Sequence, residues 1–235
     1  MLYISKKNIY IMVMSFLLPL LFLGFYKNSK VISTMAFPIK DKVIILDPGH
    51  GLPDEGASSN NGVAESVINL SICMKLKKIL EQSGITVILT RENENGIYDE
   101  ESNTIREKKV SDIKNRVKIG NESSADIFVS IHLNKIEQEE YWGWQTFYKK
   151  NSKEGKKLAD SIQKGLNEII KKENNRKPLK IENIYIVENV KIPTTIVECG
   201  FLSNKEEEKL LQDDDYQEKL AWGIYLGIMN YFYNW

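Results

Sequence analysis

Short apolar runs alternate with longer segments of helical periodicity along most of this 235-residue chain. The runs are four or five residues long and are bounded by polar residues, Gly or Pro, which is typical of buried strands. We therefore predict six strands, at 43–46, 85–89, 127–131, 144–148, 184–187 and 194–197.

Helical spacing fills the segments between these runs. Apolar positions recur at this spacing over residues 64–82, and Gly84 stands where that helix is expected to end. Thr104 and Glu107 form a capping-box pattern, which predicts the start of a helix that continues past Arg116. Further helices are predicted at 155–171, near Glu206 and at 216–231. Strands that alternate with helices predict an α/β domain layered around a largely parallel sheet.

An apolar segment precedes the first predicted strand. After Lys6 and Lys7 the chain is apolar from Ile9 to Tyr26, a length of about 18 residues at the lower limit for a membrane span. We interpret residues 1–30 as a signal or membrane-anchor segment with its linker. Retention as an anchor is preferred, and cleavage before Phe37 is the alternative. Residues 42–235 are then expected to form one catalytic domain.

Composition narrows the class of protein. The 32 basic and 32 acidic residues cancel, and this balance argues against a dedicated nucleic-acid binder. The two cysteines, Cys73 and Cys199, lie in apolar stretches without a partner at metal-site or disulfide spacing. We expect both to be small buried hydrophobic side chains.

Both histidines of the chain follow predicted buried strands. His50 lies in Asp47-Pro48-Gly49-His50-Gly51, and His132 lies in Ser130-Ile131-His132-Leu133-Asn134. In open α/β sheets, ligands bind in the crevice beyond the carboxyl ends of the strands. The shared position therefore predicts that the two imidazoles belong to one site.

A carboxylate completes this site. Glu65 lies in the first turn of the helix after the His50 loop, although the helix dipole alone also favours an acid there. Two imidazoles and one carboxylate form the usual ligand set of catalytic zinc, with a fourth position for water. Asp54 and Glu55 in the same loop fit this argument as well as Glu65. Asp47 is expected to orient one histidine as a hydrogen-bond acceptor.

Glu198 is the second acidic residue of interest, because it follows the apolar run 194–197. A carboxylate at the end of a buried strand is costly to desolvate unless a partner compensates it. Water activated by a metal is such a partner, and a glutamate beside it accepts a proton and passes it to a leaving amine. The four residues together predict metal-assisted amide hydrolysis.

Two tryptophans and one arginine give weaker functional signals. Trp142 and Trp144 are expected to be strand and core aromatics rather than a sugar-binding platform. Arg116 is expected either to pair with a buried carboxylate or to contact substrate.

From about Lys42 to the C-terminus, the sequence resembles the zinc-dependent N-acetylmuramoyl-L-alanine amidases known as amidase type 3. The resemblance rests on several motifs in the family order: Leu46-Asp47-Pro48-Gly49-His50-Gly51, Gly62 to Glu65 with Asn69-Leu70, Leu89-Thr90-Arg91, Asn115-Arg116, Ala125-Asp126, Ser130 to Asn134, and Val197 to Asn204.

This resemblance implies a three-layer αβα sandwich around a mixed, mostly parallel six-stranded sheet. It implies that His50, Glu65 and His132 hold Zn²⁺ and that Glu198 is the catalytic glutamate, and it selects Glu65 over Glu55. The implied reaction hydrolyses the amide between the lactyl group of muramic acid and the L-alanine of a peptidoglycan stem peptide.

The short chain, with one apolar leader and no wall-binding repeats, is similar to the germination-specific members of this family in spore-forming bacteria. Those enzymes act during formation of muramic δ-lactam in the spore cortex. The similarity implies an exported enzyme, anchored in the membrane or secreted to the cell wall or spore intermembrane space, and a possible lipoprotein activator, as in some clostridial members. The alternatives are a zinc peptidase or carboxypeptidase that acts on stem peptides, and a partner-dependent wall-binding module that is inactive by itself.

Overall fold

The structure is a computed structural model that describes residues 15, 41–59 and 62–233. The described residues from 41 onwards belong to one compact unit. The leader predicted at residues 1–30 lies outside the described residues except for Ser15, so its role stays a prediction. In the described ranges, no helix combines the length and the apolar character that crossing a membrane requires.

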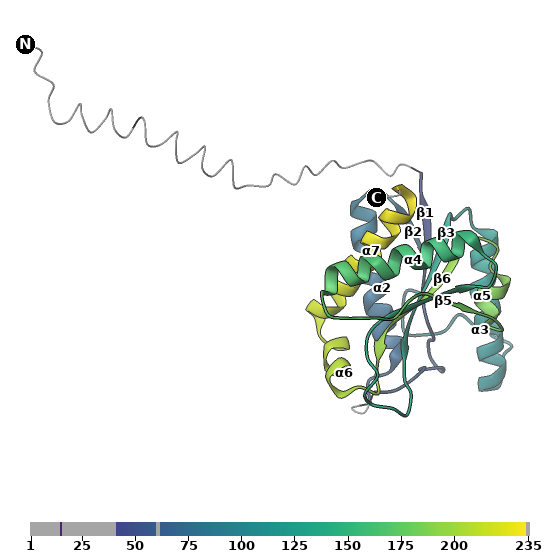
Figure 1. Cartoon of the computed structure of the whole chain (residues 1–235). Helices are drawn as coiled ribbons and strands as arrows, with labels where there is room; N and C mark the ends of the chain where they lie inside the picture. Colours follow the sequence, from purple (N-terminus) through teal and green to yellow (C-terminus); the bar gives the residue numbers. More distant parts are fainter. Residues whose placement is uncertain (1–14, 16–40, 60–61, 234–235) are drawn as a thin grey trace, which may run out of the picture. The chain divides into compact units, whose positions relative to one another are not determined.

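A six-stranded sheet forms the middle of the domain (Figure 1), with strand order β2-β1-β3-β6-β4-β5. Strand β4 runs antiparallel to β6, and the other neighbouring pairs are parallel. The mixed, mostly parallel sheet predicted from the sequence is therefore confirmed. Its strands are β1 (Val43–Pro48), β2 (Thr86–Leu89), β3 (Ile127–Asn134), β4 (Gln145–Lys149), β5 (Leu179–Ile181) and β6 (Thr194–Phe201).

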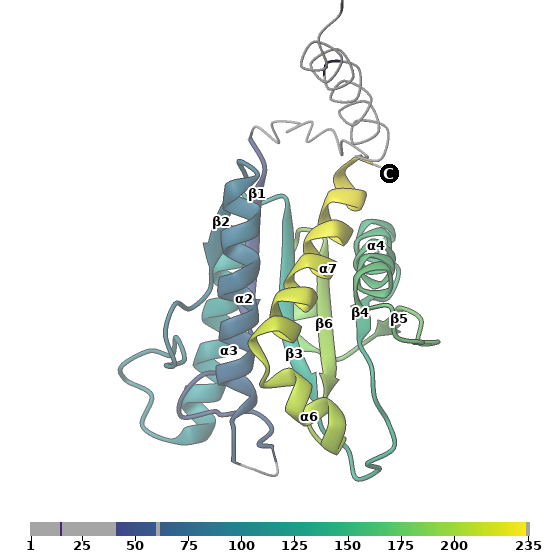
Figure 2. The same ribbon diagram turned by 90° about the vertical axis from the view of Figure 1, so that its left-hand side faces the viewer.

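Helices cover both faces of this sheet, which confirms the three-layer αβα arrangement (Figure 2). Helices α2, α4 and α7 pack on one face and on one another, whereas α3 and α5 lie together on the other face. The helices are α2 (Glu65–Gln82), α3 (Ile105–Glu122), α4 (Lys153–Ile170), α5 (Tyr185–Asn189), α6 (Lys205–Leu211) and α7 (Asp214–Tyr233).

Strand β1 supplies both hydrophobic cores because successive side chains point to opposite faces of a sheet. Ile44 and Leu46 join the larger core under α2, α4 and α7, whereas Ile45 joins the smaller core with Phe128 and Val117. All three β1 side chains are fully buried, and each contributes about 1.5–3 kcal/mol to folding. Burial on both faces fixes the end of β1, from which the His50 loop departs.

Two local signals in the sequence are confirmed. Thr104 Oγ1 accepts a hydrogen bond from Glu107 N at 3.1 Å, and a Glu107 carboxylate oxygen accepts one from Thr104 N at 2.9 Å, so the capping box forms at the start of α3. Gly84 follows α2 with a φ of +83°, the left-handed conformation that favours glycine after a helix.

The strand predicted at 184–187 is wrong, because this segment begins helix α5 (Tyr185–Asn189). A short apolar run satisfies a buried strand and a single helical turn equally well. Here Glu188 N donates to Ile184 O at 2.9 Å, and Ile186 packs into the smaller core. The fifth strand is β5, an edge strand beside β4 that starts at the exposed Leu179 and so lacks a buried apolar run.

Candidate active site

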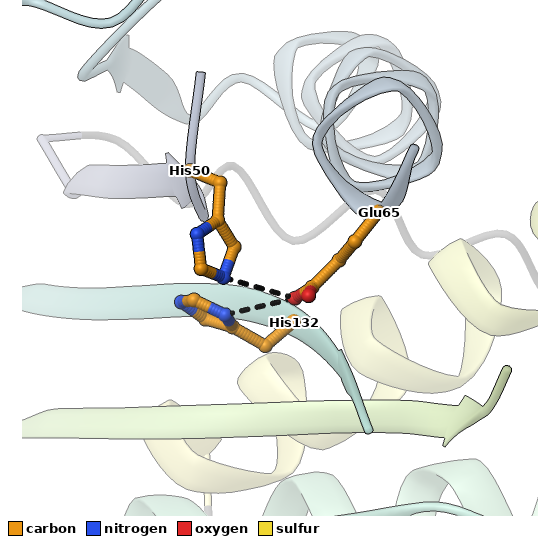
Figure 3. A group of neighbouring side chains, drawn as sticks. All are labelled: His50, Glu65 and His132. Atoms are coloured by element: carbon orange, nitrogen blue, oxygen red, sulfur yellow. Dashed lines mark hydrogen bonds and ion pairs between the residues drawn. The ribbon is translucent and has the colours of Figure 1, made fainter. Parts of the chain in front are cut away.

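Three side chains meet at the carboxyl ends of β1 and β3 (Figure 3). One ligand atom from each of His50, Glu65 and His132 lies within 4.8 Å of the other two. Glu65 Oε1 is 3.4 Å from His50 Nε2 and 3.1 Å from His132 Nδ1. His50 comes from the loop after β1, Glu65 is the first residue of α2, and His132 lies in β3. The structure thus brings together the two histidines that the sequence placed in one site.

The Glu65 carboxylate is buried and held in place by neutral donors. Ala57 N donates to Oε2 at 2.9 Å, Leu133 N donates to Oε1 at 3.0 Å, and Asn69 Nδ2 donates to Oε1 at 3.2 Å. Burial raises the pKa of Glu65, but hydrogen bonds and charges of the two imidazoles lower it well below its usual range. Glu65 is therefore ionised, and it is this carboxylate, not that of Glu55, which lies between the imidazoles.

Two glycines allow this close packing. A Cβ added at Gly49 would lie 2.3 Å from His132 Cε1, and one at Gly56 would lie 2.6 Å from Glu65 Oε2. Gly56 also has a φ of +72°, and His50 itself adopts a φ of +62°. A histidine held in the left-handed region is a strained arrangement, which is common at functional sites.

Asp54 contacts the outer nitrogen of His50. Its Oδ2 lies 3.1 Å from His50 Nδ1, while its Oδ1 lies 2.8 Å from Lys109 Nζ. Burial lowers the pKa of His50, but hydrogen bonds and charges of Asp54 and Glu65 raise it to about 9. The orienting contact expected from Asp47 is therefore made by Asp54, and nothing in the charged surface of α3 marked Lys109 as its partner.

Asp47 has a different environment, fully buried beneath the site. It accepts hydrogen bonds at 2.6 Å from Thr90 Oγ1, from Ser130 Oγ and from Arg116 Nη1. Burial raises the pKa of Asp47, but the Arg116 charge and these hydroxyls lower it below its usual range. Arg116 Nη2 also donates to His50 O at 2.5 Å. Arg116 is thus the partner of a buried carboxylate, the first of the two roles considered from the sequence.

Glu198 lies in β6, directly beside His132 in the register of the sheet. Its Oε2 is a buried oxygen that accepts no hydrogen bond from the described residues. Burial raises the pKa of Glu198 to about 7, although the nearby charge of His132 opposes this effect. A carboxyl group with a pKa near neutrality and a free oxygen is suited to proton transfer.

These groups line a cavity of about 360 Å³. His50, His132 and Glu198 lie on its polar side, while Ile184 and Ile186 add an apolar wall from the start of α5. The carboxylates and imidazoles thus face a cavity that is large enough to enclose part of a ligand.

The three side chains fit a divalent metal ion. Two imidazoles with one carboxylate are a donor set of catalytic metal sites that leaves one coordination position open. The raised pKa of His50 also shows that Glu65 and Asp54 favour positive charge at this point. In the described part of the chain, His50, Glu65 and His132 therefore form a possible metal site.

Two tryptophans and two cysteines occupy the buried positions expected of hydrophobic side chains. Trp144 is fully buried in the larger core, as expected, and Trp142 is partly buried against the same core. Cys73 and Cys199 are both buried and free, which confirms their interpretation as small hydrophobic side chains.

Known proteins share both the sequence pattern and the fold. The profile of the N-acetylmuramoyl-L-alanine amidase family matches residues 44–230. The germination-specific N-acetylmuramoyl-L-alanine amidase of Bacillus subtilis (strain 168) is 36% identical over 224 residues, which cover 93% of this chain and 94% of that protein.

Two solved structures agree with this likeness. The CwlD amidase from Clostridioides difficile, solved in complex with the GerS lipoprotein, is 47% identical, with a TM-score of 0.80 over 82% of this chain and 98% of that one. The catalytic domain of CwlV, an amidase from Bacillus (Paenibacillus) polymyxa var. colistinus, is 29% identical, with a TM-score of 0.70 over 81% of this chain and 98% of that one. Matched across nearly its whole described domain, the chain belongs to the N-acetylmuramoyl-L-alanine amidase family of hydrolases.

Proposed function

We propose that this chain is a zinc enzyme that hydrolyses the amide between the lactyl group of muramic acid and the L-alanine of a stem peptide. In this proposal His50, Glu65 and His132 hold the zinc, and Glu198 is the catalytic residue. The arrangement of the site supports this proposal: an ionised Glu65 lies between two imidazoles, and beside one of them lies a buried oxygen of Glu198 that has no hydrogen-bond partner among the described residues.

The donor set favours zinc over a harder cation. Two imidazole nitrogens with one carboxylate suit zinc, whereas magnesium and calcium prefer oxygen ligands alone. When bound, zinc supplies Lewis-acid polarisation of the amide carbonyl and acidifies water. Asp54 fixes the orientation of His50 through the nitrogen that faces away from Glu65, and Lys109 holds Asp54 in turn.

Glu198 performs the proton transfers in this proposal. Its free Oε2 accepts a proton from the attacking water and returns it to the amine of L-alanine as the amide bond breaks. Without bound metal, burial raises the pKa of this carboxyl to about 7, and a raised pKa makes the carboxylate a stronger proton acceptor. Arg116 supports the pocket from below, because it binds the backbone carbonyls of Pro48 and His50.

The biological setting is a further part of the proposal. The Bacillus subtilis relative is named germination-specific, and the Clostridioides difficile relative was solved with a lipoprotein. These likenesses support a role in the spore cortex, where peptide removal precedes muramic δ-lactam formation, and activation by a lipoprotein. Residues 1–30 would then direct the enzyme across the membrane and anchor it, with peptidoglycan in the cell wall or spore intermembrane space as the substrate.

Mass spectrometry of muropeptides tests the proposed reaction. Purified residues 37–235 with zinc and cortex peptidoglycan should release intact stem peptides that begin at L-alanine and leave peptide-free muramic acid. Cuts within the stem peptide would instead identify a peptidase. Release only after addition of a lipoprotein would establish an activator, and absence of zinc binding in calorimetry would refute the proposed ligand set.

A further inference from the structure

A second cavity, of about 780 Å³, opens between the loop before β4 and the loop after α4. Its walls combine aromatic rings, amides and one guanidinium, and its lining residues are Glu140, Tyr141, Trp142 and 173–176. None of these residues takes part in the site described above. The cavity therefore offers a separate set of chemical groups.

Arg176 is held in a defined position at this cavity. Its Nε donates to Trp142 O at 3.2 Å, and its Nη1 donates to Gln145 Oε1 at 3.1 Å. The guanidinium carbon lies 4.6 Å from the ring centroid of Phe201 and 5.6 Å from that of Tyr141. Cation–π contacts and two hydrogen bonds thus orient the guanidinium before any ligand arrives.

The charge of Arg176 has no ion-pair partner among the described residues. Glu140 and Glu173 line the same cavity, and Glu173 Oε1 accepts a hydrogen bond from Asn175 Nδ2 at 3.1 Å. Glu207 is close enough for Arg176 to lower its pKa, yet its oxygens accept hydrogen bonds from Gly143 N and Phe201 N. A positioned guanidinium without a carboxylate partner is suited to bind one from a ligand.

The sheet places Arg176 beside the active site. Gln145, which accepts the hydrogen bond from Arg176, lies opposite Glu198 in the antiparallel pair of β4 and β6. Residues directly opposite in such a pair point to the same face, with Cβ atoms about 5 Å apart. Arg176 therefore lies one side chain beyond Glu198, within reach of a substrate group one to three residues from the scissile amide, at about 3.5 Å per extended residue.

We propose that Arg176, on the platform of Tyr141 and Phe201, binds a carboxylate of the stem peptide on the peptide side of the scissile amide. This inference rests on the proposed amidase function. The two sides of the scissile bond differ in charge, because N-acetylated sugars of the glycan strand are neutral whereas stem peptides carry carboxylates. A cation near Glu198 therefore binds the peptide side of the substrate rather than the glycan side. This contact fixes the orientation of the substrate in the active site.

Two synthetic N-acetylmuramoyl peptides test this inference, one with its free carboxylates and one with the same carboxylates converted to primary amides. In the zinc-loaded full chain, Arg176→Gln should lower kcat/KM about 10- to 100-fold on the acidic substrate, chiefly through KM, because charge-assisted hydrogen bonds are lost. On the amidated substrate the same variant should stay within about twofold of the wild type. Arg176→Lys should recover part of the loss, since it restores the charge without the planar fork.

Lys177→Gln is the matched control, because it removes an exposed positive charge from the neighbouring position. It should leave the ratio of kcat/KM between the two substrates unchanged. That ratio is independent of how much of each variant is folded. Equal losses of Arg176→Gln on both substrates would overturn the inference, whereas a wild-type chain that cleaves neither substrate, with or without an added lipoprotein, would refute the proposed function itself.

Discussion

Asp47 and Glu198 are two carboxylates beneath the same pocket, and their surroundings differ in one respect. Asp47 is paired with Arg116 and two hydroxyls, which lower its pKa despite complete burial. Glu198 has a buried oxygen that accepts no hydrogen bond in the part of the chain that the structure describes, and burial raises its pKa to about 7. Desolvation acts on both groups, so the presence of a cation and donors decides which carboxylate is ionised and structural.

This comparison explains why the two residues have different tasks. A carboxylate with all its hydrogen bonds made is a fixed anchor, which here joins β1 and β3 to α3 through Arg116 and Ser130. A carboxylate that lacks such bonds has a vacant acceptor oxygen and a pKa near the pH at which the enzyme operates, as a general base needs. Asp47 therefore stabilises the site, whereas Glu198 is available for proton transfer.

The largest expected effect is on activity at Glu198. Glu198→Gln keeps the shape of the side chain but removes its basic oxygen, so kcat should fall about 10²- to 10⁴-fold. Zinc affinity, measured by calorimetry, and the midpoint temperature of thermal unfolding should stay the same or rise. Glu168→Gln, an exposed change on α4, is the control. Full activity of Glu198→Gln would remove this residue from the mechanism.

At Asp47 we expect the loss to appear in stability. Asp47→Asn removes the fully buried counter-charge of Arg116, which keeps its ion pair with Asp112 at 2.6 Å, so the free energy of unfolding in urea should fall by about 3 kcal/mol. The matched change, Asp160→Asn, removes one partner of an exposed ion pair with Lys156 and should have little effect. Similar losses in the two variants would show that burial of the pair is unimportant.

Glu207 is an intermediate case, because its carboxylate accepts hydrogen bonds from backbone N–H groups of Gly143 and Phe201 but forms no ion pair within the described ranges. Burial raises its pKa to about 7. Since the folded chain then holds a proton that the unfolded chain releases near pH 4.5, this group's contribution to stability falls as pH rises from about 4.5 to 7.

Urea unfolding at pH 5 and pH 7.5 measures this dependence. Glu207→Gln should show a smaller loss of stability over that range than the wild type, by up to about 3 kcal/mol. Glu182→Gln, a change of an exposed carboxylate, should leave the pH profile as it is. An unchanged profile in Glu207→Gln would mean that backbone donors alone keep this carboxylate ionised, and the contrast between Asp47 and Glu198 would lose its explanation.

The smallest of these effects concerns the support of His50. Asp54→Asn removes the carboxylate that faces His50 Nδ1, so zinc affinity should fall about 10- to 100-fold in a competition assay with a chelating dye. Lys109→Gln should produce a smaller decrease, because Asp54 then loses only its own counter-charge. An unchanged affinity in Asp54→Asn would show that packing alone orients His50.

Much of the site could be predicted because its signals are local. His50 and His132 each follow a buried apolar strand, and a parallel arrangement of those strands brings their carboxyl ends to one edge. Glu198 could be predicted because a carboxylate at the end of an apolar run is costly to bury without a partner. The capping box at Thr104 also depends on only three residues of spacing, so the start of α3 was predictable.

Other features depended on packing between distant segments. The segment 184–187 is apolar enough for a strand, and only its place against the smaller core made it helical.

By itself, the sequence determined the alternation of strands and helices, the two histidines at strand ends, and the family. The choice of Glu65 over Glu55 came from the family resemblance, and only the tertiary structure decided that Asp54 rather than Asp47 contacts His50 and that Arg176 approaches Gln145. The physical reason is distance along the chain: local spacing sets helical and strand periodicity, whereas contacts such as Arg116 with Asp47, 69 residues apart, form only when the layers pack.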